Sequence, residues 1–256
     1  MPSVKSAFKT WSDYSGYVED SVHLTHEGHA YLALVPEVLA ALDSEAQEIE
    51  RAQFRADRAK REIEDGFWML HAHSLLGLWS AFETLIGDIF VSRIVENPSI
   101  LEQEIFRKYK LPAALFANRD IEEVSSALFE LVCSNGNLGT APGRYEYLLS
   151  AVGLGGTLPA RVSKLIHRSQ SIRNLCAHRG GVVDAKFLQH PDGNVLGARV
   201  NLSTREFLPL MHSMHMYSLI ILNRLQVEQG EQIRIVDCAG FEGVMAAAFP
   251  VAPNLE

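Results

Sequence analysis

Three polar residues near the end of a predicted helix have the types and spacing that cleavage of an RNA backbone requires. Arg173, Asn174 and His178 lie in one segment, and at about 3.6 residues per turn Asn174 and His178 are neighbours on one helix face. The imidazole can act as general base on a 2′-hydroxyl or as general acid on the leaving 5′-oxygen, and the guanidinium can stabilise charge on the phosphorane without a metal. Arg and His at a helix end can also simply cap carbonyl groups and pair with carboxylates, so both interpretations stay open.

The same part of the sequence concentrates positive charge. Between Gly139 and Val183 there are six Arg or Lys residues and one acid, Glu146, whereas the whole chain has a net charge of -8. An acidic chain is not expected to coat nucleic acid non-specifically, because such binding depends on Lys and Arg that neutralise phosphates. Any anion site must therefore be local. The residues predicted to bind the substrate are Arg161, Lys164, Arg168 and Arg179.

Glu83 is a second polar residue in an unusual position. In the predicted helix from Phe67 to Val95, the residues that share its face are mostly apolar or small, so its carboxylate is expected to point into the core. A desolvated carboxylate needs a partner, since an unpaired buried charge costs several kcal/mol. Arg173 is the expected partner, and an ion pair with Arg144 or Arg161 is the alternative.

The hydrophobic pattern predicts an all-α protein, an antiparallel helical bundle with a small β-hairpin between its last two core helices. Helical periodicity is clear from about Thr25 to Asn97, and later helices are expected at 101–133, 144–152, 159–179 and 204–227. The hairpin is expected near 182–202, where two strand-like runs flank Pro191-Asp-Gly-Asn194. The predicted domains are an N-terminal helical arm (1–64), a bundle (65–228) and a C-terminal extension (229–256). The charged part of the arm is expected to be a solvated helix face or a coiled-coil arm.

The segment Ser169-Gln-Ser-Ile-Arg-Asn-Leu-Cys-Ala-His-Arg-Gly-Gly-Val-Val-Asp184 resembles the signature of the HEPN superfamily. That signature is an Arg and a polar residue, three further residues and a His, followed here by small residues that stop the helix. Tyr147 to Leu154 and Trp79 to Ile86 are similar to neighbouring segments of the family, the second of which bears an acidic residue. The resemblance covers roughly Asp65 to Gln226.

Membership of this family implies an up-and-down helical bundle, a homodimer that brings two Arg-His helices together, and in many members endoribonuclease activity in toxin-antitoxin or other defence systems. Carried over to this sequence, the catalytic residues would be Arg173, Asn174 and His178, with Glu83 orienting Arg173. One position departs from the family. Toxins silenced by nucleotide transfer carry a tyrosine two residues after the histidine, where this chain has Gly180, so that form of control is not expected here.

Other sites and locations are disfavoured by the sequence. His23-Leu-Thr-His-Glu-Gly-His29 has one residue too few between Glu and the last His for the zinc-protease pattern, and the three cysteines are too far apart for a zinc motif. No metal or other cofactor is expected. The N-terminus lacks an apolar signal region, and the long apolar stretch from Phe207 to Val227 contains several polar residues. We therefore expect a cytoplasmic protein with no membrane segment.

The sequence leads to one main hypothesis and one main alternative. The first is a metal-independent endoribonuclease that acts on RNA, as a toxin or antiviral defence effector, with a composite active site in a homodimer. The alternative is a catalytically silent HEPN-like binding or scaffold subunit of a defence or regulatory complex. A third possibility is that cleavage occurs only after a partner, such as a cognate antitoxin or another defence-system protein, releases or activates the chain.

Overall fold

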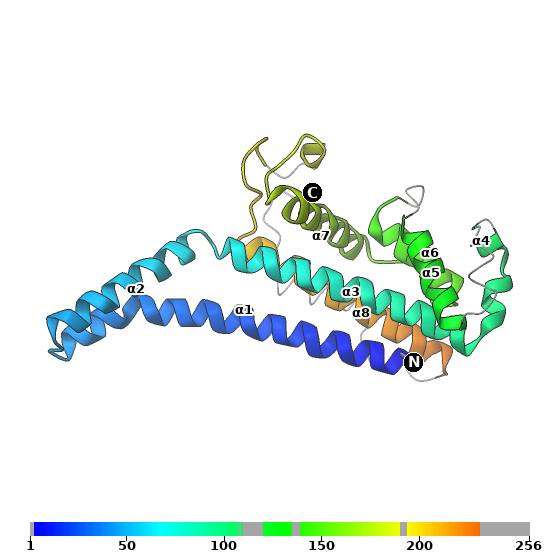
Figure 1. Ribbon diagram of the computed structural model, residues 1–256, viewed down its shortest axis with the longest axis horizontal. Helices are drawn as coiled ribbons and strands as arrows, with labels where there is room; N and C mark the ends of the chain where they lie inside the picture. The colour runs from blue at the N-terminus through cyan, green and yellow to red at the C-terminus, as the bar shows by residue number, and fades with distance from the viewer. Residues whose placement is uncertain (1–2, 108, 110–119, 135–138, 190–193, 231–256) are drawn as a thin grey trace. The chain divides into compact units, whose positions relative to one another are not determined.

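The computed structural model describes residues 3–107, 109, 120–134, 139–189 and 194–230, and this part of the chain is helical (Figure 1). The α-helices are α1 (Val4–Ala41), α2 (Ala46–Glu64), α3 (Trp68–Glu96), α4 (Glu104–Arg107), α5 (Ile121–Ser134), α6 (Ala141–Ala151), α7 (Ala160–Arg179) and α8 (Thr204–Glu228). Two short 3-10 helices are η1 (Pro98–Glu102) and η4 (Phe187–Gln189). The predicted all-α class and helical bundle are confirmed for the described residues.

The chain forms two compact units. The first unit contains residues 1–11, 81–168 and 212–256, and the second contains residues 12–80 and 169–211. The division falls within α1, α3, α7 and α8, so each of these helices contributes one part to each unit. The predicted domain boundaries stay a prediction, and residues 231–256 of the predicted C-terminal extension lie outside the described residues.

Aromatic side chains form the core of the first unit. The ring of Phe82 lies 5.5 Å from that of Trp11, 5.8 Å from Tyr145 and 5.5 Å from Tyr217. The Trp11 indole also donates a 2.9 Å hydrogen bond to the Ser218 hydroxyl, so its one polar atom is satisfied inside the core. These contacts join the start of α1 to α3, α6 and α8.

The second unit begins with the pair of helices α1 and α2. In Figure 1, α2 folds back along the C-terminal part of α1. The contact face of α2 is a row of alanines, Ala52, Ala56 and Ala59, all of them buried. Small side chains at i, i+4 and i+7 allow two helix backbones to approach closely, while the polar and charged residues between them, Gln53, Arg55, Asp57 and Arg58, stay exposed. The prediction of a solvated charged face is confirmed for α2.

The ends of several helices agree with the sequence prediction, but the start of α1 does not. The structure places that start at Val4, far before the predicted Thr25. Ala7, Trp11, Ser15 and Val22 are the buried residues along this part of the helix. Polar and charged residues separate them, so the apolar positions are too sparse for the pattern to be recognised in the sequence alone.

The β-hairpin is not formed as two strands in the described residues. One antiparallel bridge joins Val182 to Arg199, with the Val183 amide donating to the Ala198 carbonyl at 2.9 Å. The first run then leaves the extended conformation, because the Asp184 carboxylate accepts the Phe187 amide at 2.8 Å and starts the turn η4. Residues 190–193 of the predicted turn lie outside the described residues.

One described helix, α3, is long and apolar enough to cross a membrane by length and composition. Half of its most apolar window is buried inside the protein. The sequence analysis had singled out the segment that forms α8 instead. Both helices carry polar residues with partners inside the fold, such as His71 in α3 and Ser218 in α8.

Candidate functional site

The predicted catalytic residues Arg173, Asn174 and His178 lie in the C-terminal half of α7, in the second unit. The buried side chains of Ile172 and Leu175 anchor this part of the helix, while Asn174 and His178 stay exposed. His178 lies in the last turn of α7, one residue before its end. The helix therefore presents the predicted residues at its end.

Two glycines end α7 directly after the predicted site. Gly180 and Gly181 have φ values of 58° and 81°, which residues with a side chain rarely adopt. The Gly181 amide donates back to the Leu175 carbonyl at 3.0 Å. Gly181 also lies so close to Trp68 that a Cβ atom would fall 2.2 Å from the ring. The end of α7 is thus packed directly against the start of α3.

Arg173 and Asn174 are in contact with each other. The Nη1 of Arg173 donates a 3.1 Å hydrogen bond to Oδ1 of Asn174. Asn174 and His178 are exposed, and they are one turn apart on the same face. The hydrogen bond to Asn174 therefore brings the Arg173 guanidinium toward the helix face that carries Asn174 and His178. The arrangement places a permanent cation, an amide and an imidazole at one exposed helix end.

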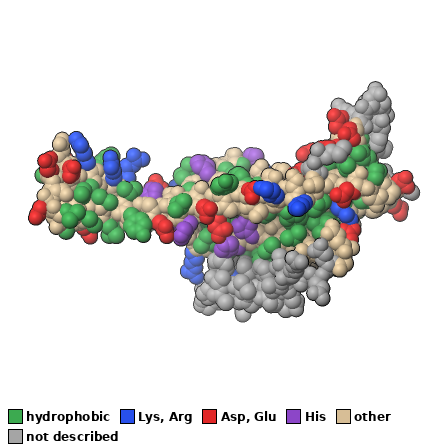
Figure 2. Space-filling model, turned by 90° about the horizontal axis from the view of Figure 1, so that it is seen from below, with side chains coloured by type: hydrophobic (Ala, Val, Ile, Leu, Met, Phe, Trp, Pro, Cys, Tyr) green, Lys and Arg blue, Asp and Glu red, His purple; other side chains and the backbone are tan. Residues whose placement is uncertain are grey.

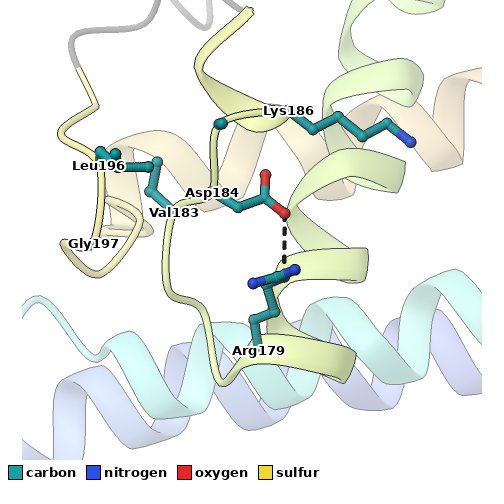
Figure 3. Close-up of a pocket in the computed structure, with 7 residues that line it drawn as sticks. Arg179, Val183, Asp184, Lys186, Leu196 and Gly197 are labelled. Atoms are coloured by element: carbon teal, nitrogen blue, oxygen red, sulfur yellow. Dashed lines mark ion pairs between the residues drawn. The ribbon is translucent and has the colours of Figure 1, made fainter.

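A pocket of about 520 Å³ follows the helix end (Figure 3). It is lined by Arg179, Val183, Asp184, Ala185, Lys186, Leu196 and Gly197. The Arg179 Nε lies 3.2 Å from Oδ2 of Asp184, whose other oxygen accepts the Phe187 amide. An ion pair through Nε orients the guanidinium and leaves its two terminal nitrogens for an anion such as a phosphate.

Three of the predicted substrate-binding residues lie in the other unit. Arg161, Lys164 and Arg168 belong to the N-terminal part of α7, which is in the first unit. Lys164 is exposed, and Arg161 and Arg168 are half-buried. Of the four, Arg179 is therefore the residue that shares a unit with Arg173, Asn174 and His178.

Glu83 is half-buried in the first unit, and the sequence analysis missed one of its partners. The hydroxyl of Tyr145 donates a 3.1 Å hydrogen bond to Oε1 of Glu83. Burial, and then the charge of Glu83, raises the pKa of Tyr145 well above its usual value, so the phenol stays protonated and keeps donating. Arg173 belongs to the second unit, so the predicted pairing of Glu83 with Arg173 stays a prediction.

Glu146, the one acid in the basic part of the sequence, supports the chain just before α7. It accepts hydrogen bonds from Tyr217 at 2.6 Å, from Arg224 at 2.9 Å and from the Gly156 amide at 3.0 Å. Arg224 also donates to the carbonyl of Leu154. The carboxylate of Glu146 is thus bound to α8 and to the loop before α7.

The second unit also contains a pair of histidines that the sequence analysis did not connect. Nε2 of His26 in α1 lies 3.1 Å from Nε2 of His71 in α3, and Nδ1 of His71 donates to the Leu202 carbonyl at 2.8 Å. His71 is fully buried and stacks on Phe207. Because Nδ1 of His71 carries its proton, Nε2 accepts from His26 when both rings are neutral. No group of three or more His, Cys, Asp or Glu residues in the described ranges could hold a metal ion.

The His71 pair makes stability depend on pH. Burial lowers the pKa of His71 from 6.5 to about 4, so its stabilising effect is complete above pH 6.5 and is lost as the pH falls toward 4. Over this window we expect the free energy of unfolding to decrease by up to about 3 kcal/mol. Urea unfolding at a series of pH values measures this change.

Two variants separate the His71 effect from the general effect of acid. His71→Phe should reduce the pH dependence between 6.5 and 4, because no buried imidazole remains to be protonated. His73→Ala, which removes an exposed histidine two residues away, should leave the dependence unchanged. Equal pH dependence in wild type and His71→Phe would show that His71 does not titrate as stated.

No protein-family model matches the chain, and no curated protein or solved structure matches it either. A functional assignment must therefore be argued from the residues and their arrangement.

Proposed function

We propose that this chain is a metal-independent endoribonuclease of the HEPN type. The observation that supports this most directly is the end of α7, where Asn174 and His178 are exposed on one face and Asn174 holds the Arg173 guanidinium at 3.1 Å. The pocket with Arg179 begins one residue after His178, so an anion-binding group lies next to the proposed proton-transfer group. No cofactor is required by this proposal.

In the proposed reaction the 2′-hydroxyl of RNA attacks the neighbouring phosphorus, and the bond to the 5′-oxygen breaks. His178 transfers a proton, either from the 2′-hydroxyl or to the leaving 5′-oxygen. Arg173 stabilises the negative charge on the phosphorane oxygens, and Asn174 positions Arg173. Arg179 would hold a phosphate of the substrate, and Arg161, Lys164 and Arg168, in the N-terminal part of α7, would bind further phosphates.

Two further elements belong to the proposal. A homodimer would join two copies of the α7 end into a composite active site, which supplies a second imidazole for the other proton transfer. Glu83 would orient Arg173, as in the family that the sequence resembles. The biological role would be that of a cytoplasmic toxin or antiviral defence effector, with an antitoxin or another defence protein as partner.

The alternative is a catalytically silent HEPN-like binding or scaffold subunit. One observation favours it: α1 exposes large apolar side chains, including Tyr17 and Tyr31, at 74% and 69% of their full exposure. Exposed apolar surface of this kind marks interaction sites. A scaffold would keep this surface without any turnover of RNA.

Incubation of the protein with RNA in EDTA distinguishes the endoribonuclease from the catalytically silent scaffold. Purified wild type should cut total cellular RNA into discrete fragments on a denaturing gel, because none of the proposed groups needs a metal. The Arg173→Ala, His178→Ala double variant, prepared in the same way, should give none. Fragments from both preparations would indicate a contaminating nuclease, and fragments from neither would favour the scaffold.

A further inference from the structure

The helix α1 has apolar residues on two opposite faces. One face is buried and includes Val22 and Pro36. The other carries Tyr17, Leu24, Tyr31 and Val38, which are 74%, 66%, 69% and 55% exposed. At about 100° per residue Leu24 lies about 200° round the helix from Val22, so the second face points away from the fold. Figure 2, which views α1 from outside, shows hydrophobic side chains along this surface.

The exposed residues follow a coiled-coil pattern. Tyr17, Leu24, Tyr31 and Val38 are each seven residues apart, and a second set at intervening positions continues the stripe. That second set is Ser21, Gly28, Val35 and Leu42. From Tyr17 to Leu42, over 26 residues, the spacing between successive members alternates between four and three positions. This is the spacing of residues that pack against a second helix in a coiled coil. We call these eight residues the α1 stripe.

The charges beside the α1 stripe exclude two kinds of partner. No Lys or Arg occurs between Thr10 and Glu50, whereas Asp20 and Glu27 directly flank the stripe. Nucleic acid and anionic lipid surfaces both carry phosphates, which the acidic side chains in this part of α1 repel. Together with the coiled-coil spacing, these charges favour a protein helix as the partner.

We propose that the α1 stripe packs against the α1 stripe of a second copy of this chain, in antiparallel orientation. A two-fold axis between Gly28 and Tyr31 places Tyr31 of each copy over Gly28 of the other, where nothing lies within 4 Å of a Cβ atom at Gly28. The same register pairs Val38 with Ser21. Each of these layers joins a large residue to a small one, which fills space evenly.

The remaining contacts of this register are also complementary. Leu24 meets Val35, and Tyr17 meets Leu42, so every layer is apolar or small. A parallel pair would instead stack Gly28 on Gly28 and Tyr31 on Tyr31, which alternates gaps with crowded layers. In the antiparallel register Glu27 faces Leu34, and Asp20 faces Ala41, so like charges stay apart. Self-complementarity of one surface is what a two-fold interface requires.

This interface is independent of the proposed cleavage chemistry. The interface contains no residue of α7 and none of the residues proposed to bind or cleave RNA. A chain without nuclease activity can form it, and a chain that cleaves RNA can lack it. Its test therefore measures association only.

Disulfide trapping in the full chain tests the register. Ser21 and Val38 are 17 residues apart, about 25 Å along one helix, so they cannot bond within a chain. Ser21→Cys, Val38→Cys together should give a covalent dimer on oxidation, seen on a non-reducing gel. Each single variant should give no more dimer than wild type, whose own cysteines set the background. Trapping by Ser21→Cys alone would indicate a parallel pair and overturn the proposal, as would no trapping by the double variant.

Sedimentation equilibrium tests the contribution of the stripe without any cross-link. Leu24→Glu should weaken association through α1 at least tenfold, because it places a charge in an apolar layer, and it should leave any association through the ends of α7 unchanged. Ala30→Glu adds the same charge at an exposed position off the stripe and should associate like wild type. Circular dichroism shows whether both variants stay folded. A monomeric wild type, or a Leu24→Glu variant that associates like wild type, would overturn the proposal.

Discussion

Replacing His178 with alanine is expected to abolish RNA cleavage and to leave the fold intact. General acid-base catalysis by one side chain contributes roughly 100-fold to 10,000-fold to a rate, so the loss should fall in this range or exceed it. The side chain is exposed and lies at the end of α7, so the free energy of unfolding should change by less than about 0.5 kcal/mol. Initial rates on a short labelled RNA in EDTA, with urea unfolding of the same samples, measure both quantities.

A matched variant makes the His178 result specific. His73 is also an exposed histidine of the second unit, but it lies on α3 and has no place in the proposed reaction. His73→Ala should therefore cleave RNA at the wild-type rate. If His178→Ala retained full activity in a preparation free of other nucleases, the proposed mechanism would be wrong. If both variants lost activity, the effect would not come from proton transfer.

The sequence predicted α7 well because the signals that bound it are local. Pro159 precedes its first turn, Gly180 and Gly181 follow its last residue, and the apolar positions between them repeat at the helical period. The exposed position of Asn174 and His178 follows from the same period. Arg173 begins about 100° round the helix from Asn174, and its hydrogen bond to Asn174 brings the guanidinium toward the side of that residue.

The partners of the polar residues could not be predicted in the same way, because they are distant in sequence. Tyr145 meets Glu83 across 62 residues, and His71 meets His26 across 45. Neither pair can be recognised from the local periodicity of the sequence, because each forms only when two helices pack together. The turn η4 was missed for a different reason. Val182 and Val183 have high strand propensity, but the Asp184 side chain captures the Phe187 amide and turns the chain.

The α1 stripe shows how the context of a pattern matters. Val38 and Leu42 belong to the apolar pattern of this helix, and in a sequence such residues are expected to face the core. The structure buries the opposite face of α1 and leaves both more than half exposed. The helical period of the apolar residues was therefore predicted correctly. What differs is that these residues face away from the core of their own chain.

The second large effect is expected at Gly181, which closes α7 beside the candidate site. Its φ of 81° costs roughly 1–2 kcal/mol for a residue with a side chain. A Cβ atom would also lie 2.2 Å from the Trp68 ring, and overpacking of this kind costs roughly 1–3 kcal/mol more. The ring cannot easily move away, because it is buried and its indole donates to the Val200 carbonyl at 2.8 Å. Gly181→Ala should thus lower the free energy of unfolding by roughly 2–5 kcal/mol, as measured by urea denaturation.

Gly180→Ala separates the two causes, since the neighbouring glycine has a similar backbone but different surroundings. Its φ is 58°, and nothing lies within 4 Å of a Cβ atom built there. This variant should therefore lose only the backbone contribution of roughly 1–2 kcal/mol. If both variants lost the same free energy of unfolding, the Trp68 ring would have moved to make room for the new methyl group at position 181. A larger loss at Gly181 would establish that contact with Trp68 fixes the end of α7, and with it the position of His178.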